Sequence, residues 1–246
     1  MIKSKKPILI LQFRPESEVS ESEFKAFLKY GKINKDDVVR IRAEYEMPSV
    51  NLEKYSAVII GGGPYNVSDK KKTKTQIKVE EKLFQLMKKI EKRDFPYLGN
   101  CYGFGVTALA CGGMVSKEKY SEEAGAVTIK LTSEGKRDKI LQGVKENFRA
   151  FVGHKETCQR LPNGAINLAL SKTCPYHMYR LKNNIYAVQF HTELDYEGIV
   201  PRIDFYKYHG YFPPEEAENL KEKLAQEKIT EPMKILKNFI DIYYKN

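Results

Sequence analysis

The chain has 246 residues, 41% of them hydrophobic, which is enough for one large domain with a full core. Its 42 lysines and arginines exceed its 32 aspartates and glutamates by ten, but they are widely spread, which favours a solvated basic surface over a nucleic-acid site. No apolar run approaches the roughly 20 residues of a membrane span or the length of a signal-peptide core, so we expect a cytoplasmic protein that binds neither nucleic acid nor membrane.

The amino-terminal half alternates strand patterns with helix patterns. The hydrophobic spacing predicts a strand at 7–13, a helix at 20–30, strands at 37–45 and 55–60, and an amphipathic helix at 76–92 whose apolar stripe includes Ile77, Leu83 and Ile90. This alternation predicts an α/β fold built on a largely parallel sheet. Ligands of such sheets collect at the carboxyl ends of the strands.

A further strand at 95–98 runs into the sequence Gly99-Asn100-Cys101-Tyr102-Gly103. The spacing is that of a nucleophile elbow with cysteine in place of serine, because glycines at the two flanking positions avoid collision with the neighbouring strand and helix. A helix follows, and its amino end is expected to lower the pKa of the Cys101 thiol and to offer N–H groups to an oxyanion. The alternative interpretation is a buried structural cysteine between two loop glycines.

Another β-rich run, at 185–190, ends in His191-Thr192-Glu193. Residues two apart in an extended chain face the same side, so the Glu193 carboxylate can orient the His191 imidazole. That imidazole would then serve as the base for the Cys101 thiol, which makes these three residues the predicted catalytic triad. His154 is the alternative base, and we prefer His191 because of its carboxylate partner at a strand end.

These two blocks and the turn Gly61-Gly62-Gly63-Pro64 resemble the three sequence blocks of class I (triad) glutamine amidotransferases, closest to the stand-alone GMP synthase-like amidotransferase domain. The resemblance spans roughly residues 7–195. It implies a three-layer, flavodoxin-like fold with a mostly parallel, open sheet and helices on both faces. It also implies that the N–H groups of Gly63 and Tyr102 hold an oxyanion, and that Gly62 and Glu156 contribute to the substrate site. A plain turn at 61–64 is the alternative.

Two positions depart from that family's pattern. Members of that family usually have glutamine four residues after the nucleophile, where this chain has Gly105. They usually have His-Pro-Glu where this chain has His191-Thr192-Glu193. The resemblance implies hydrolysis of the γ-amide of glutamine, or of a related γ-glutamyl compound, through a cysteine thioester. Ammonia would pass to an unknown acceptor or to a synthetase partner subunit. The alternative is a catalytically impaired regulatory or binding subunit that has lost glutamine binding at Gly105.

The resemblance fades near residue 195. We therefore predict an amidotransferase-like domain at 1–195 and a C-terminal helical extension at 196–246, packed on the same domain, with helices at 213–226 and from 230 onward. The four cysteines form no Cys-x-x-Cys pair and the four histidines are scattered, so we expect reduced thiols and neither a metal nor a cofactor. The oligomeric state is left open.

Overall fold

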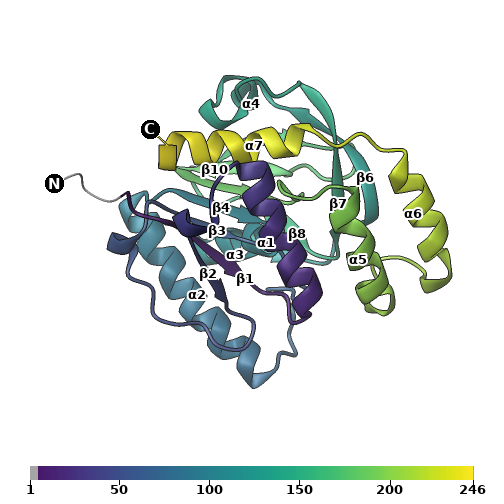
Figure 1. The fold of residues 1–246 in the computed structure, drawn as a ribbon, viewed down its shortest axis with the longest axis horizontal. Coiled ribbons are helices and arrows are strands. Elements are labelled where there is room, and N and C mark those ends of the chain that lie inside the picture. The colour runs from purple at the N-terminus through teal and green to yellow at the C-terminus, as the bar shows by residue number, and fades with distance from the viewer. Residues whose placement is uncertain (1–4, 246) are drawn as a thin grey trace.

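A nine-stranded sheet in the order β2-β1-β3-β4-β11-β10-β9-β6-β7 runs through the centre of the computed structural model, which describes residues 5–245 (Figure 1). The strands of this sheet are β1 Ile8–Gln12, β2 Val38–Arg42, β3 Ala57–Ile60, β4 Tyr97–Asn100, β6 Glu122–Leu131, β7 Asn147–His154, β9 Ile166–Leu170, β10 Met178–Leu181 and β11 Ile185–Val188. The helices are α1 Ser17–Gly31, α2 Lys74–Arg93, α3 Tyr102–Ala110, α4 Ser133–Arg137, α5 Tyr196–Tyr206, α6 Ala217–Ala225 and α7 Glu231–Ile240. The strands β5 Met114–Ser116 and β8 Thr157–Arg160 form a separate two-stranded sheet.

Five neighbouring strands, β2, β1, β3, β4 and β11, pair in parallel. Four of them, β1, β3, β4 and β11, are buried along their whole length, because helices cover both faces of a parallel sheet. The strand order reverses between β1 and β3, and ligand sites of doubly wound sheets lie at such a reversal, beyond the carboxyl ends of the strands. The Gly61–Gly63 turn, Cys101 and His191 all follow strands of this parallel block.

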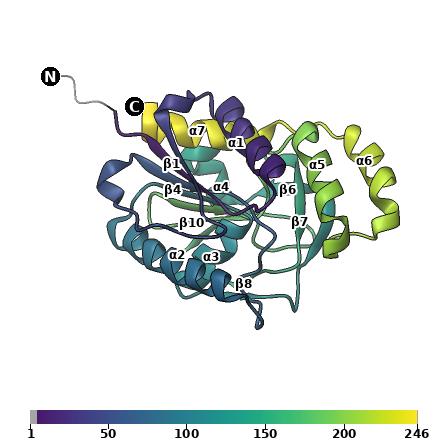
Figure 2. The same cartoon turned by 60° about the horizontal axis from the view of Figure 1, so that its bottom comes forward.

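Helices cover both faces of the sheet (Figure 2). Apolar side chains of α1 and α7 pack on one face, in a core that includes Phe24, Phe27 and Leu236. Those of α2 and α3 pack on the other face, together with alternate residues of β1 and β3. The predicted α/β class, with a mixed, mostly parallel central sheet and C-terminal helices, is thus confirmed.

Three local predictions need correction. Ile77 is 45% exposed, because the buried stripe of α2 is instead completed by side chains such as Val79 and Leu86. The helix α5 was not predicted, since Pro201 interrupts its pattern. The strand β8, which carries Cys158, was also not predicted. The division of the chain at residue 195 stays a prediction.

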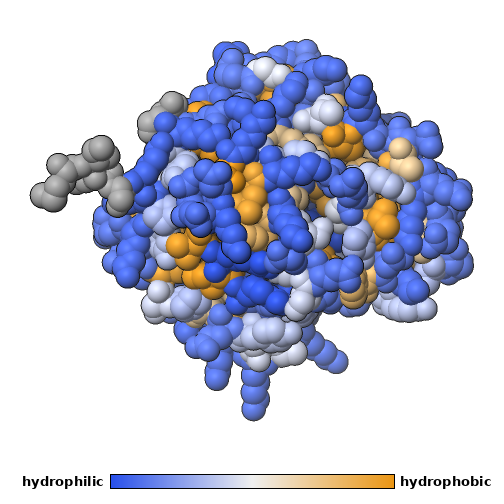
Figure 3. Space-filling view, viewed as in Figure 1, coloured by the Kyte–Doolittle hydropathy of each residue, from blue (hydrophilic) through white to orange (hydrophobic). Residues whose placement is uncertain are grey.

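Hydrophilic side chains cover most of the molecular face shown in Figure 3, with small apolar areas between them. Among the described residues, no helix combines the length and the hydrophobicity needed to cross a bilayer.

Candidate active site

Cys101 occupies a strained turn between β4 and α3. Its backbone angles are φ 48° and ψ −93°, in a region that side chains rarely adopt and that a nucleophile elbow imposes. A Cβ atom on Gly99 would lie 2.8 Å from the carbonyl oxygen of Gly103, so a side chain at the first of these positions would force the turn open. The strand, turn and helix predicted around Cys101 are therefore present, and the two glycines allow their close approach.

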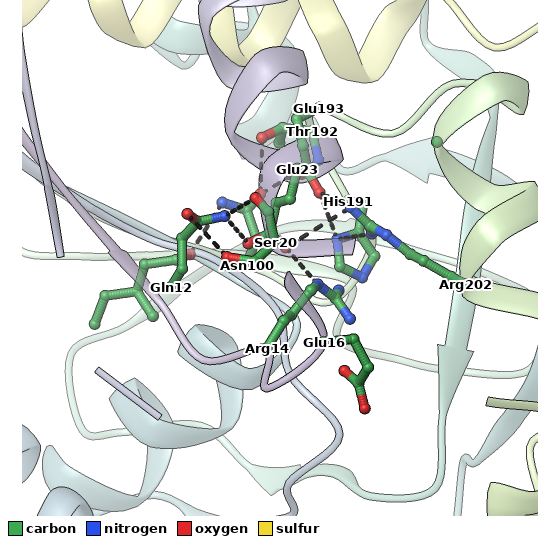
Figure 4. A network of polar contacts seen from close by, with 12 residues as sticks. Gln12, Arg14, Glu16, Ser20, Glu23, Asn100, His191, Thr192, Glu193 and Arg202 are labelled. Atoms are coloured by element: carbon green, nitrogen blue, oxygen red, sulfur yellow. Dashed lines mark hydrogen bonds and ion pairs between the residues drawn. The ribbon is translucent and has the colours of Figure 1, made fainter. Parts of the chain in front are cut away.

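His191 and Glu193 are buried and lie side by side. Their Nδ1 and Oε1 atoms are 2.9 Å apart, and Nη1 of Arg202 lies 3.2 Å from the same Nδ1. In the tautomer that carries its hydrogen on Nδ1, this nitrogen donates to the carboxylate and Nε2 is the basic nitrogen. Arg202, from α5, donates its Nη2–H to the same Glu193 oxygen over 3.0 Å. Figure 4 shows the three side chains converging from the end of β11 and from α5. The structure thus brings together the two triad residues predicted from the sequence and adds an arginine.

A second buried ion pair stands next to the first. Arg14, just beyond β1, donates its Nε–H to Glu23 of α1 over 2.7 Å, and Gln12 donates to the other oxygen of that carboxylate over 2.9 Å. Arg202 lies 3.7 Å from Glu23 and so joins the two pairs into one network (Figure 4). Two guanidinium groups and two carboxylates balance in charge, which is the condition for burying them together.

This network sets the protonation of the site. Burial lowers the pKa of His191, and the positive charge of Arg202 lowers it further against the opposing effect of Glu193. Burial disfavours ionised Glu193, but His191 and Arg202 outweigh it and hold the pKa of that carboxyl below its usual range. The histidine is therefore neutral, and available as a base, over the physiological pH range.

The expected lowering of the thiol pKa is not found. Burial raises the pKa of Cys101 to about 11, and the nearby charge of Arg14 only partly counteracts this. Desolvation of the thiolate is the largest influence on this pKa, and the negative charges of Glu156 and Glu193 act in the same direction. The site therefore holds a neutral thiol and a neutral imidazole that line one cavity.

Asn100 ties three strand ends together. Its Nδ2–H donates to the carbonyl oxygen of Ile60 at the end of β3 over 3.2 Å. Its Oδ1 accepts from the hydroxyl of Thr192 over 2.7 Å and from the backbone N–H of Thr192 over 3.2 Å. Class I glutamine amidotransferases usually have proline at this position, and proline has neither a hydroxyl group nor a backbone N–H to donate. The departure at Thr192 therefore adds two hydrogen bonds that fix the histidine loop to the elbow.

The glycine-rich turn after β3 packs against the histidine. A Cβ atom on Gly62 would lie 2.5 Å from Cε1 of His191 and 2.7 Å from Nη2 of Arg14, so only glycine fits there. Gly63 and Cys101 line the same cavities, and Tyr102 is the first residue of α3. Among the described residues, the N–H groups of Gly63 and Tyr102 donate to no protein acceptor, as groups kept for an oxyanion would.

Two cavities meet at Cys101. The first, here called the α5 cavity, encloses about 70 Å³. It is lined by Cys101, His191, Arg14, Gly63, Pro64, Ala124, Val152, Gly153, Leu194, Ile199, Arg202, Ile203, Tyr206, Tyr211 and Phe212. The second, here called the Glu156 cleft, encloses about 20 Å³. It is lined by Cys101, Tyr102, Gly105, Glu156, Gly63, Tyr65, Asn66, Gly153, His154, Lys155, Gln189 and Tyr211.

Glu156 lies next to Gly105, the position at which class I glutamine amidotransferases usually have glutamine. A Cβ atom on Gly105 would lie 3.1 Å from Oε1 of Glu156. The carboxylate accepts from the backbone N–H groups of Val67 and Ser68 over 2.8 Å each, and from the Ser68 hydroxyl over 2.6 Å. Burial raises the pKa of Glu156 in spite of these bonds. Gly105 therefore does not widen the Glu156 cleft, and the predicted substrate residue Glu156 holds the 66–68 loop.

His154 has a different environment from His191. It is buried, its Nε2 lies 2.9 Å from Glu122 Oε2, and its Nδ1 lies 3.1 Å from the carbonyl oxygen of Glu156. Both ring nitrogens thus have partners at the back of the Glu156 cleft, which favours His191 as the base.

Within residues 5–245, two buried groups have the residue types of a metal site: His154 with Cys174 and His177, and Glu23 with His191 and Glu193. In the second group the guanidinium groups of Arg14 and Arg202 already neutralise the carboxylates, so that a cation there would be repelled. In the first, His154 and His177 both face the Glu122 carboxylate, at 2.9 and 3.0 Å.

Several residues of the site were missed in the sequence. Arg14 could have been found, because it follows directly on the first central strand and so lies at the ligand edge of the sheet. Tyr206, Tyr211 and Phe212 belong to an aromatic cluster visible in the sequence, and the fold turns them into a wall of the α5 cavity. Nothing in the sequence pointed to Arg202, whose approach to Glu193 depends on how α5 packs.

The chain is similar in sequence and in fold to glutamine amidotransferases. A family model described as glutamine amidotransferase class-I matches residues 24–205. A glutamine-hydrolysing GMP synthase subunit from Sulfolobus acidocaldarius is 31% identical over 144 residues, which are 58% of this chain and 70% of that protein. The corresponding subunit from Thermoplasma volcanium is 28% identical over 152 residues, covering 61% and 69%. The match to the GMP synthase of Wolinella succinogenes spans only 27% of that protein.

Among solved structures, a glutamine amidotransferase from Thermotoga maritima superposes with a TM-score of 0.76 at 20% identity, over 97% of this chain and 99% of that one. A GMP synthase subunit from Thermoplasma acidophilum superposes with a TM-score of 0.64 at 20% identity, over 97% and 94%. At this identity the superpositions show a shared fold. Since the family model covers well over half of the sequence, the chain belongs to the class I glutamine amidotransferase family.

Proposed function

We propose that the protein is a cysteine amidohydrolase that cleaves the γ-amide of glutamine, or of a related γ-glutamyl compound, through a thioester on Cys101. The observation that carries this proposal is the convergence of Cys101, on its strained elbow, with the bonded pair His191–Glu193 at one cavity. A nucleophile, a neutral base and a carboxylate that orients the base are the three parts that acyl transfer requires.

Catalysis would begin with transfer of the thiol proton to Nε2 of His191 as Sγ attacks the amide carbon. The N–H groups of Gly63 and Tyr102 would stabilise the resulting oxyanion, and rigid backbone donors need little reorganisation to do so. The imidazolium, stabilised by Glu193, would then give its proton to the departing amine. In the second half, water activated by His191 would attack the thioester, break the C–S bond and release the acid.

The fate of the ammonia is proposed by analogy with the relatives. Two of them are named as subunits of GMP synthase, which supports a synthetase partner as the acceptor of ammonia. Hydrolysis without any acceptor is the simpler possibility, and both use the same Cys101 chemistry.

A second candidate is a regulatory subunit that binds a ligand without turning it over. It is favoured by the small volume of the Glu156 cleft and by the bonds that tie Glu156 to the 66–68 loop, because both restrict space next to Gly105. A glutaminase assay of the purified chain separates the two candidates.

Labelling with an electrophilic glutamine analogue tests the proposal most directly. Burial raises the pKa of all four thiols to about 11 or 12, so selective labelling of Cys101 would reflect recognition by the site rather than thiolate content. We expect labelling of Cys101 alone, read by peptide mass spectrometry, and loss of turnover in Cys101→Ser with the fold retained. Cys111→Ser, which alters a partly exposed thiol, is the matched control and should stay active. Equal labelling of Cys111, or turnover by Cys101→Ser, would overturn the assignment.

A further inference from the structure

Four buried side chains next to the Glu156 cleft have no part in the proposed reaction. Glu122 at the start of β6 and His154 at the end of β7 are paired in register, and Cys174 and His177 belong to the segment between β9 and β10. We call these four residues the Glu122 cluster. Spacing along the sequence, on which the expectation of no metal rested, does not show this group, because the sheet brings its members together.

The side chains of the Glu122 cluster converge on one point. Nε2 of His154 and Nε2 of His177 lie 2.9 and 3.0 Å from Oε2 of Glu122. A ring nitrogen of each histidine and Sγ of Cys174 all lie within 4.8 Å of one another. Zinc bonds of roughly 2.0–2.3 Å at tetrahedral angles separate ligand atoms by roughly 3.3–3.8 Å. Displacements on the order of 1 Å or less would therefore place these atoms around one ion.

The contacts of His154 require a cation at its Nε2. Its Nδ1 lies 3.1 Å from the carbonyl oxygen of Glu156, which can only accept, so Nδ1 carries the hydrogen. In the neutral ring the lone pair of Nε2 then faces the Glu122 carboxylate over 2.9 Å, which sets two acceptors against each other. Either a second proton or a metal ion at Nε2 makes this contact favourable.

The environment of His177 favours the metal ion. Its ring is fully buried, and within residues 5–245 neither ring nitrogen has a partner in hydrogen-bond geometry, although Nε2 lies close to Glu122. A proton on His154 would leave both nitrogens of His177 unpaired, which is costly for a buried polar group. A metal ion would use the lone pair of His177 Nε2 and that of His154 Nε2 together.

The surroundings of the cluster have the form of an outer shell around metal ligands. His154 donates its Nδ1–H to the carbonyl oxygen of Glu156. Oε1 of Glu122 accepts from the hydroxyl of Ser171 over 2.9 Å and from that of Thr173. Bonds of this kind orient ligating imidazoles and carboxylates and leave their other atoms for the ion. A surface hollow lined by Glu122 and His154 gives an ion a way in.

We propose that the Glu122 cluster binds one Zn²⁺ ion, with His154, His177, Cys174 and Glu122 as its ligands. Nitrogen and sulfur ligands suit zinc, whereas Mg²⁺ and Ca²⁺ prefer oxygen alone. The thiol of Cys174 loses its proton to solvent on binding, so that one thiolate and one carboxylate neutralise the ion. Because His154 also binds the carbonyl of Glu156, the ion fixes a wall of the Glu156 cleft. The proposal does not depend on the chemistry at Cys101.

Zinc content and thermal stability of the full chain test the proposal. After dialysis against a slight excess of zinc sulfate, we expect about one zinc ion per chain in elemental analysis. An ion that binds only the folded protein also stabilises it. At a free zinc concentration 100-fold above Kd, Tm should rise by roughly 5–11 °C for a chain of this size. Wild-type protein that takes up no zinc would overturn the inference.

Substitutions locate the ion. Cys174→Ser and His177→Gln each remove a ligand and should weaken zinc binding by at least roughly 100-fold, because even the loss of an outer-shell partner costs about 10–100-fold. The Tm of both variants should no longer respond to zinc. Cys111→Ser and His209→Gln are the matched controls, since they change a partly exposed thiol and an exposed imidazole, and they should retain the ion.

Cobalt in place of zinc gives an optical measurement that does not depend on stability. A thiolate ligand adds a charge-transfer band to the spectrum of bound Co²⁺, and Cys111→Ser should keep this band whereas Cys174→Ser should lose it. Zinc retained by both ligand variants, once circular dichroism shows that they are folded, would mean binding at the surface only and would overturn the inference. If neither variant folds, the wild-type spectrum decides, and bound Co²⁺ without the thiolate band would contradict the proposed ligand set.

Discussion

Replacement of Arg202 by methionine tests the buried network around the base. The change removes the guanidinium that binds Glu193 over 3.0 Å and leaves a buried carboxylate with one partner fewer. Breaking one side of a buried ion pair costs about 3–5 kcal/mol in the free energy of unfolding. For a chain of this size each kcal/mol lowers Tm by roughly 2–4 °C, so a fall of roughly 6–20 °C is expected.

The same change should alter the pH dependence of activity. Arg202 Nη1 lies 3.2 Å from Nδ1 of His191, and at an effective dielectric constant near 20 two unit charges at that distance interact by about 5 kcal/mol. This repulsion lowers the pKa of His191, so its removal raises that pKa. The base works only when neutral, and activity is lost as the pH falls through its pKa. The acid limb of the kcat/KM profile should therefore move to higher pH.

The control and the refuting result are both accessible. Arg93→Met removes a comparable pair, but Arg93 and Glu53 are exposed, so the change should cost less than about 1 kcal/mol and leave the pH profile unaltered. Thermal denaturation and initial rates across pH measure both effects. An Arg202→Met protein whose acid limb stays in place, or moves to lower pH, would refute the electrostatic role of Arg202.

Three further substitutions test the assignment of the site. His191→Ala should remove nearly all amidase activity. His154→Ala should retain a measurable rate, because both ring nitrogens of His154 already have protein partners. An inactive His154→Ala protein beside an active His191→Ala protein would show that His191 is not the base. Gly105→Gln should raise the KM for glutamine by roughly tenfold, because the new side chain displaces Glu156 from its loop at a cost on the order of 1–3 kcal/mol; a lower KM would show that the pocket lacked only that contact.

The sequence by itself determined the frame of the protein. Apolar runs without alternation specified the parallel strands, and the spacing of glycines around Cys101 specified the elbow, because both patterns act within a few residues of the chain. The pairing of His191 with Glu193 was equally local, since an extended chain places alternate residues on one side. These features depend on the local backbone geometry of strands and turns, which residues close together in the sequence determine.

Only the tertiary structure decided the environment of those groups. Arg14 and Arg202 reach the proposed triad from distant segments. Burial lowers the pKa of His191 and raises that of Cys101 to about 11, and the second effect is the reverse of the one expected for the thiol. Desolvation depends on everything packed around a group, and no short pattern encodes it. The contact between Gly105 and Glu156 also joins segments that lie far apart in the sequence. The same is true of the residues that line the α5 cavity, so neither feature could be predicted from a short pattern.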